Sequence, residues 1–99
     1  MKFLAIEKEL KPIPDEMAAD ILEQEAKKAW QYYCDGIFRE VYFDKDTHGA
    51  VIILECESGD TARAYLYELP LVEQGYITFE IRQLAPYDGF GRLMYGEKT

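Results

Sequence analysis

The most informative stretch of the chain is residues 37–57, which read IFREVYFDKDTHGAVIILECE. Its two ends, 37–44 and 50–57, are rich in β-branched and aromatic residues, and such residues favour strands. The residues between them, Lys-Asp-Thr-His-Gly, are polar and include a glycine, which is typical of a short connection between paired strands. The stretch therefore predicts a β-hairpin in the middle of the chain.

A long helix is predicted immediately before this hairpin. Over residues 15–35, apolar side chains recur every three or four positions and form one stripe along a helix. Asp15 places negative charge at the expected N-terminus, and Gly36 is the residue type that commonly ends a helix. Trp30 and Tyr33 fall on the apolar stripe, so we expect both in the core.

Three further elements complete the pattern. Residues 1–9 and 77–84 alternate with period two, as strands do. The apolar side chains of residues 60–69 recur at helical spacing until Pro70 ends the run. The resulting order, β-α-β-β-α-β, is that of the ferredoxin-like α+β fold, in which two helices cover one face of a four-stranded antiparallel sheet.

The length of 99 residues is that of a single domain. We expect this domain to occupy residues 1–86 and an irregular tail to occupy residues 87–99. Tyr87, Phe90 and Leu93 are too apolar to stay in water, so the tail should dock on the domain or on a partner subunit.

The charge balance excludes some partners. The chain carries 19 acidic against 11 basic side chains, a net charge of -8, which repels phosphate backbones and anionic membrane surfaces. No apolar run approaches the roughly 18 to 20 residues of a membrane span, and residues 1–9 contain no signal-peptide core. We therefore expect a cytoplasmic protein that binds neither nucleic acid nor a membrane.

The sequence also predicts that no cofactor or metal is bound. Cys34 and Cys56 lack the spacing of metal ligands and are expected as reduced thiols. The single histidine, His48, lies in the hairpin loop, where polar residues are ordinary turn material, although its pKa range would also suit proton transfer. No glycine-rich loop stands between a strand and a helix, where a phosphate-binding loop would have to lie.

Alternation along the strands predicts which side chains share a face. The side chains expected beneath the helices are Leu4, Ile6, Ile52, Leu54, Ile77, Phe79 and Ile81. Those expected on the opposite face are Phe3, Ala5, Glu7, Phe38, Glu40, Tyr42, Val51, Ile53, Glu55, Thr78, Glu80, Arg82 and Leu84. A bulge in the second strand would exchange its two faces. Because the opposite face mixes apolar and charged residues, we expect a second sheet to cover it in a homodimer or higher homo-oligomer.

Charged residues of this mixed face are the candidate binding site for a small molecule. Burial between two sheets raises the pKa of a carboxylate and makes it a usable base, although the same groups also fit as solvated charge or in ion pairs at the rim. The substrate-binding candidates are Glu7, Glu55 and Arg82, with Glu40 beside them.

A second segment, ELPLVEQGYITFEIRQLAPY at residues 68–87, resembles the end of the last helix and the final strand of the muconolactone delta-isomerase family. The likeness consists of a Leu-Pro-Leu break, an aromatic residue after a short loop, and a Glu-Ile pair shortly before a final Leu and Pro. The residues that carry it are Leu69, Pro70, Leu71, Tyr76, Glu80, Ile81, Leu84 and Pro86. In weaker form it spans residues 1–86 and includes the Gly36-Ile37-Phe38-Arg39 run. The fold that this resemblance implies is a dimeric α+β barrel.

The resemblance implies cofactor-free isomerisation of a small unsaturated lactone by removal and return of a proton. We therefore expect a substrate that is a small unsaturated or aromatic acid or lactone. In this interpretation Glu80 is the base, Arg39 binds a substrate carboxylate and Tyr42 donates a proton. Arg39 also fits as a surface or dimer contact, and Tyr42 as a packing residue. The first strand departs from the family, because Leu4-Ala5-Ile6-Glu7 stands where the enzyme has a His and a Lys. In the second strand, Tyr42 and Phe43 stand where it has a Trp and an Arg.

Two other functions are compatible with the same fold. One is a noncatalytic module whose cavity binds a metabolite or is filled by side chains, with the tail mediating assembly. The other is a cofactor-free monooxygenase that acts on an aromatic substrate.

Overall fold

The computed structural model describes residues 1–95. Its elements are β1 (Lys2–Glu9), α1 (Asp15–Cys34), β2 (Phe38–Phe43), β3 (Ala50–Glu55), α2 (Gly59–Tyr67), α3 (Pro70–Glu73), β4 (Ile77–Leu84) and α4 (Gly89–Tyr95).

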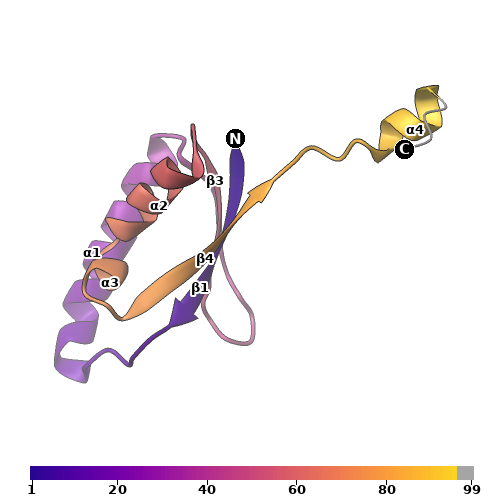
Figure 1. Cartoon of the computed structure of the whole chain (residues 1–99). Coiled ribbons are helices and arrows are strands. Elements are labelled where there is room, and N and C mark those ends of the chain that lie inside the picture. The colour runs from indigo at the N-terminus through magenta and orange to yellow at the C-terminus, as the bar shows by residue number, and fades with distance from the viewer. Residues whose placement is uncertain (96–99) are drawn as a thin grey trace.

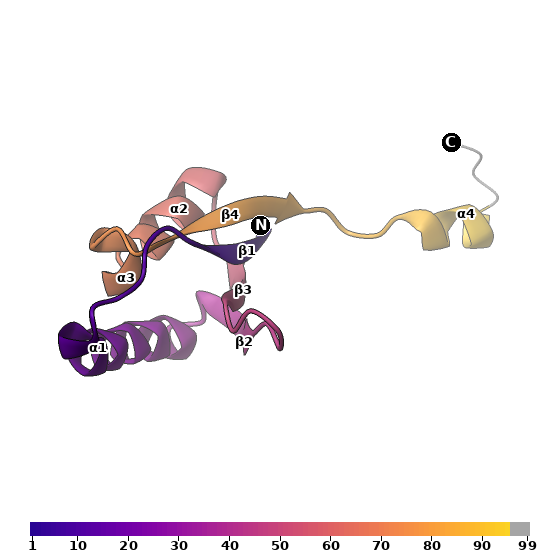
Figure 2. The same ribbon diagram turned by 90° about the horizontal axis from the view of Figure 1, so that it is seen from below.

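The four strands form one antiparallel sheet in the order β2-β3-β1-β4. Helices α1, α2 and α3 all lie on the same face of this sheet, and the other face is bare (Figures 1 and 2). The predicted ferredoxin-like α+β fold is therefore confirmed, with α3 as a short additional helix between α2 and β4.

Local sequence explains where the elements begin and end. Gly36 follows α1 at φ 79° and Gly75 precedes β4 at φ 82°, a left-handed conformation that glycine adopts without steric cost. The Ser58 hydroxyl accepts a hydrogen bond from the Thr61 backbone N–H at 3.1 Å and caps the start of α2. Pro70 occupies the first turn of α3, where its missing N–H costs nothing.

The core lies between the sheet and the helices. Its fully buried large side chains are Phe3, Phe38, Leu54, Leu66 and Leu69. Tyr32 of α1 is also buried, and its ring contacts Phe38 and Tyr65 edge-on at 5.4 Å and 5.0 Å between centroids. The Tyr32 hydroxyl donates a hydrogen bond to the Glu68 carboxylate at the end of α2, so the two long helices are joined by a polar contact as well as by packing.

The structure corrects the predicted faces of β1 and of Phe38. Phe3 and Ala5 are buried beneath the helices, opposite Leu54 and Ile52 of β3, so the prediction that they lie on the other face was wrong. A bulge between Phe38 and Glu40 shifts the register of β2 and turns Phe38 into the core.

The faces predicted for β3 and β4 are confirmed by the burial pattern. Ile52 and Leu54 are buried under the helices, and so are Ile77 and Phe79. The bare face carries charged side chains of β3 and β4 together with half-buried apolar residues. These apolar residues are Leu4, Ile6, Val51 and Ile53.

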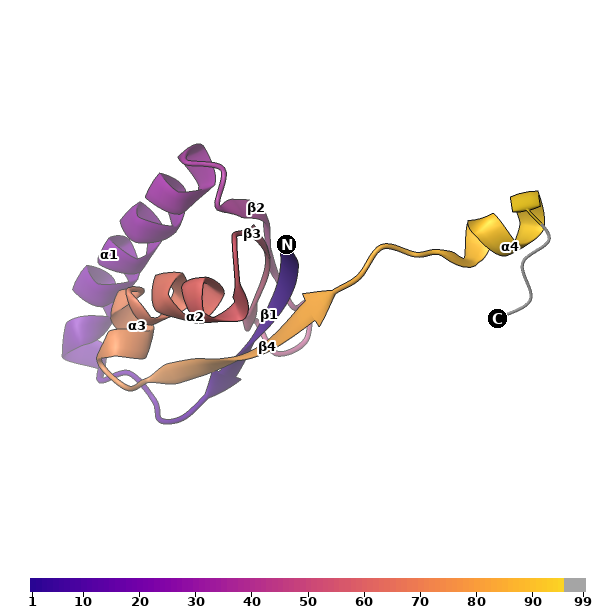
Figure 3. The ribbon, with the colours of Figure 1, turned by 45° about the horizontal axis from the view of Figure 1, so that its top comes forward.

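The end of the chain leaves the body of the molecule as an arm (Figures 1 and 3). Beyond Leu84 the chain runs on without pairing and ends in α4, a helix that the sequence did not predict within the tail. The molecule therefore measures 61 × 28 × 20 Å. Phe90 and Leu93 of α4 are 66% and 84% exposed, and the expected docking of this tail stays a prediction. Residues 96–99 of the tail lie outside the described residues.

Among residues 1–95, no helix has the length and hydropathy to cross a membrane.

Candidate functional site

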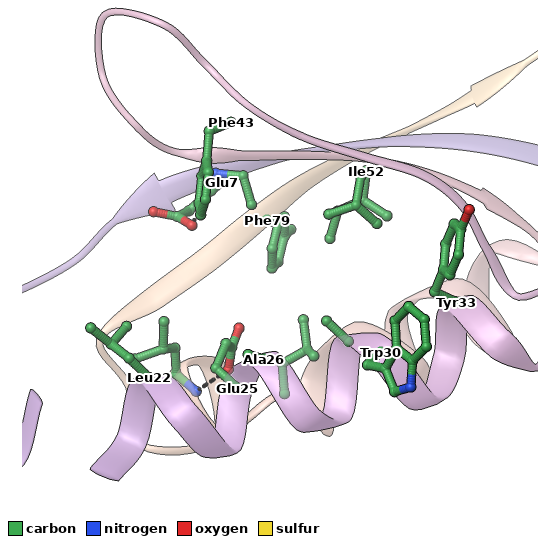
Figure 4. Close-up of a pocket in the computed structure, with 14 residues that line it drawn as sticks. Glu7, Leu22, Glu25, Ala26, Trp30, Tyr33, Phe43, Ile52 and Phe79 are labelled. Carbon is green, nitrogen blue, oxygen red and sulfur yellow. Dashed lines mark hydrogen bonds between the residues drawn. The ribbon is translucent and has the colours of Figure 1, made fainter. Parts of the chain in front are cut away.

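A pocket of about 570 Å³ lies between α1 and the sheet (Figure 4). This volume falls within the range of small-molecule sites. The pocket is bounded by α1 on one side and by all four strands and the α2–α3 connection on the other. Its lining residues are Glu7, Leu22, Glu25, Ala26, Ala29, Trp30, Tyr33, Val41, Phe43, Ala50, Ile52, Leu69, Leu71 and Phe79.

The walls of the pocket are almost entirely apolar. Ile52, Leu69 and Phe79 are buried core residues at its inner surface. Trp30 and Tyr33 lie at one end and stack on each other at 5.8 Å between ring centroids. They are 65% and 50% exposed, so the prediction that they are core residues was wrong: the aromatic end of the α1 stripe borders an open pocket.

Glu25 of α1 points from the helix into this apolar space (Figure 4). Its Oε1 accepts a hydrogen bond from the Leu71 backbone N–H at 2.9 Å, at the start of α3. The pKa of the Glu25 carboxyl is raised above its usual value, chiefly because burial removes water from the charged form and also because Glu7 is nearby. The bond from Leu71 opposes this shift without reversing it.

Glu7 of β1 lies on the wall of the pocket opposite Glu25 (Figure 4). Its Oε1 accepts a hydrogen bond from the Ala50 backbone N–H at 3.1 Å, which fixes the carboxylate against β3. In each carboxylate, Oε1 accepts the hydrogen bond from the backbone N–H. The other oxygen, Oε2, can accept a hydrogen bond from a ligand. The arrangement is a pair of positioned, half-buried carboxylates in a largely apolar pocket, which suits proton transfer.

None of the described residues that line the pocket is a Lys, Arg or His. The lining therefore offers no cation to hold a ligand's carboxylate. Within residues 1–95, no group of three or more His, Cys, Asp or Glu side chains is placed to hold a metal ion.

Of the residues predicted for the site, Glu7 alone lies in this pocket, and it lies there because β1 presents the opposite face to the one predicted. Glu80 and Arg82 lie on the bare face, where Arg82 Nη2 pairs with Glu80 Oε1 at 3.3 Å. Both side chains are substantially exposed, at 42% for Glu80 and 64% for Arg82. Their role in binding or catalysis stays a prediction, because it requires a second sheet to cover the bare face and enclose a cavity there.

The remaining predicted residues also lie outside the pocket. Tyr42 is exposed, and its hydroxyl donates to Glu40 Oε1 at 2.7 Å, which raises the pKa of the tyrosine. Arg39 lies at the bulge, and its Nε donates to the Gly36 carbonyl. Glu55 pairs with the amino group of Met1 at 2.8 Å, and this contact lowers the pKa of the Glu55 carboxyl.

Sequence reasoning missed Glu25, although a signal for it exists. Glu25 stands four residues after Ile21 and four before Ala29, within the apolar stripe of α1. A carboxylate on a core-facing stripe is costly unless it has a partner or a task. Its position in that stripe distinguishes Glu25 from the other acidic residues of the helix.

Comparison with solved structures identifies the same fold in two enzymes. Muconolactone isomerase superposes with a TM-score of 0.76 and 18% sequence identity, covering 88% of this chain and 91% of that chain. The second enzyme is the 5-chloro-2-hydroxyhydroquinone dehydrochlorinase of Burkholderia phenoliruptrix AC1100, solved in complex with 2,5-dihydroxybenzoquinone. It superposes with a TM-score of 0.62 and 18% sequence identity, covering 90% of this chain and 98% of that chain.

Sequence comparison alone finds neither relationship: no family model matches the chain, and no curated protein matches it. The muconolactone isomerase-like resemblance inferred from the sequence is thus confirmed at the level of the fold, and the chain has the architecture of muconolactone isomerase.

Proposed function

We propose that the protein is a small cofactor-independent enzyme that moves a proton on an unsaturated ring compound held between α1 and the sheet. The observation that carries this proposal is the pair of carboxylates, Glu7 and Glu25, on opposite walls of an otherwise largely apolar pocket. Enzymes that remove and return protons use such pairs when the environment separates the two pKa values.

The two carboxylates are suited to different parts of the reaction. Burial favours the protonated form of Glu25, so this residue serves as the acid that donates a proton to the ring or hydrogen-bonds the developing enolate oxygen. Glu7, bonded to the Ala50 N–H, serves as the base that takes the proton from a ring carbon. One proton is removed and one is delivered, so the substrate is isomerised without a net change in composition.

The structural neighbours support this class of chemistry. One is an isomerase of a lactone, and the other removes hydrogen chloride from a chlorinated hydroxyhydroquinone, as their names state. Both compounds are small rings, which a pocket of about 570 Å³ accommodates.

Hydrogen exchange monitored by NMR tests the proposal. The protein is incubated in D₂O with muconolactone or with hydroxyhydroquinone, and the incorporation of deuterium at ring carbons is followed. We expect exchange of hydroxyhydroquinone, the uncharged compound of the two, with the wild type, its loss in Glu25→Gln, and its retention in Glu23→Gln, a matched change on the solvent side of α1. Muconolactone carries a carboxylate and serves as the charged comparison. If Glu80→Gln abolishes exchange while Glu25→Gln does not, the reaction takes place at the bare face instead.

The same experiment separates the alternative functions. Binding of these compounds without exchange would identify a noncatalytic binding module. Consumption of dissolved oxygen with formation of an oxygenated product would identify a monooxygenase.

We also propose that a second copy of the chain covers the bare face. Leu4, Ile6, Val51 and Ile53 support this proposal, because an apolar strip of this kind across the centre of a sheet is rarely left in water. The arm supports it too. A seven-residue helix is too short to be stable alone, so α4 needs a surface to pack on, and a partner subunit supplies one.

A further inference from the structure

We propose that the pocket selects uncharged ring molecules whose polar groups are hydroxyl donors, and that it rejects the corresponding carboxylates. This inference deepens the proposed function, on which it rests, by naming the class of ligand. It departs from the sequence-based expectation of an acid substrate held by Arg39.

The first step of the argument concerns charge inside the pocket. Among the described residues that line the pocket, Glu7 and Glu25 are the carboxylic acids and none is a Lys, Arg or His, so any charge on this lining is negative. A ligand carboxylate would be placed beside these two groups between largely apolar walls, and like-charge repulsion would oppose its binding. The net charge of -8 adds to the repulsion on approach.

The second step concerns hydrogen bonding. A carboxylate accepts hydrogen bonds and donates none, so a ligand satisfies it by supplying O–H or N–H groups. The Leu71 and Ala50 backbone N–H groups each engage one oxygen, and a ligand hydroxyl can reach the other. A ligand without donors would leave these partly buried oxygens without a hydrogen-bond donor when it displaced water from the pocket.

The third step concerns why the ligand is neutral rather than cationic. Between the carboxylates the pocket is walled by Ile52, Leu69 and Phe79, and these side chains cannot replace the hydration of a full charge. The same walls favour the protonated form of Glu25, which removes part of the attraction for a cation. A flat ring can pack against the apolar walls, and its hydroxyl groups can donate hydrogen bonds to the carboxylates.

A matched set of three ligands tests the inference. 4-Hydroxybenzyl alcohol, 4-hydroxybenzoate and 4-hydroxybenzylamine share one ring and one phenol and differ in the charge of the second group. Binding is measured by titration at neutral pH, following the indole N–H resonance of Trp30, the only tryptophan of the chain. Because Trp30 lines the pocket, this signal reports binding there rather than on the bare face.

We expect the alcohol to bind at least tenfold more tightly than the acid. In the double variant Glu7→Gln/Glu25→Gln the acid should gain affinity and the ratio should approach one. The control, Glu23→Gln, removes one negative charge from the solvent side of α1 and should leave the ratio unchanged.

Three results would overturn the inference: equal or tighter binding of the acid, tightest binding of the amine, or no shift of the Trp30 resonance with any ligand. Selective binding of the alcohol without any deuterium exchange would instead refute the proposed enzymatic function and leave the ligand class intact. Deuterium exchange on a carboxylate substrate, together with poor binding of the alcohol, would refute the ligand class and leave the proposed enzymatic function intact.

Discussion

Glu25 of α1 accepts a hydrogen bond from the backbone N–H of Leu71 at 2.9 Å, so a side chain of the pocket also holds the first turn of α3. The two roles can be separated by substitution, because glutamine keeps the acceptor and removes the charge, whereas alanine removes both.

We expect Glu25→Ala to be less stable than Glu25→Gln by about 1 kcal/mol, the usual net value of a hydrogen bond whose donor is left unpaired in a partly buried place. Urea unfolding of the two variants at one pH measures this difference. Equal stability would show that water satisfies Leu71 as well as Glu25 does.

The raised pKa of Glu25 makes the stability of the protein depend on pH. Because the pKa of this carboxyl is higher in the folded than in the unfolded chain, the folded state binds more protons above the usual value of 4.5. The contribution of Glu25 to the free energy of unfolding is therefore largest below pH 4.5 and falls as pH rises through the folded pKa.

Unfolding curves of wild type and Glu25→Gln between about pH 4 and about pH 8 isolate this contribution. The variant should become more stable relative to wild type as pH rises. The companion change Glu7→Gln should weaken the trend, because Glu7 contributes to the shift. A difference between wild type and Glu25→Gln that did not vary with pH would contradict the shift.

Tyr32→Phe should cost about 1 kcal/mol of stability. The substitution removes the hydroxyl that donates to Glu68 but keeps the ring contacts with Phe38 and Tyr65. The matched change Tyr33→Phe, one position along at the exposed rim of the pocket, should lie within about 0.5 kcal/mol of wild type. Chemical denaturation of both variants checks the contrast, and equal losses would contradict it.

Ile53→Lys should separate the proposed subunits. Ile53 lies on the bare face of β3, so a lysine there places a charge in the proposed interface and leaves the helix-covered core intact. Sedimentation at micromolar concentration should show a homodimer or larger assembly for wild type and a monomer for the variant, with unchanged circular dichroism. Ala19→Lys, on the exposed side of α1, is the control. A monomeric wild type would refute the proposed assembly.

The order of elements could be predicted from the sequence, because helix and strand periodicity differ and the connecting residues mark the boundaries. The faces of β1 could not. Phe3 and Ala5 alternate with Leu4 and Ile6, so both faces of this central strand are apolar and alternation alone gives no direction. The bulge before Glu40 is likewise set by pairing with β3, which local sequence does not report.

The pocket could not be predicted from the sequence either, because alternation does not determine which face of β1 lies beneath the helices. Glu7 was placed on the wrong side of the sheet with the rest of β1, and its partner Glu25 belongs to another element. Their proximity depends on how α1 lies across the sheet, and this angle follows from the packing of residues such as Ile21 and Tyr32.

The position of β1 has a consequence for how the chain acquires its structure. β1 precedes the other three strands of the sheet in the sequence, yet it lies in the interior of the sheet and pairs on one side with β4, so that Lys2 lies opposite Leu84. Such contacts close nearly the longest loop that the domain allows, and contacts of this kind slow folding. The sheet can therefore be completed only after β4 has been synthesised, and until then β1 has an unpaired edge to which chaperones or neighbouring nascent chains can bind.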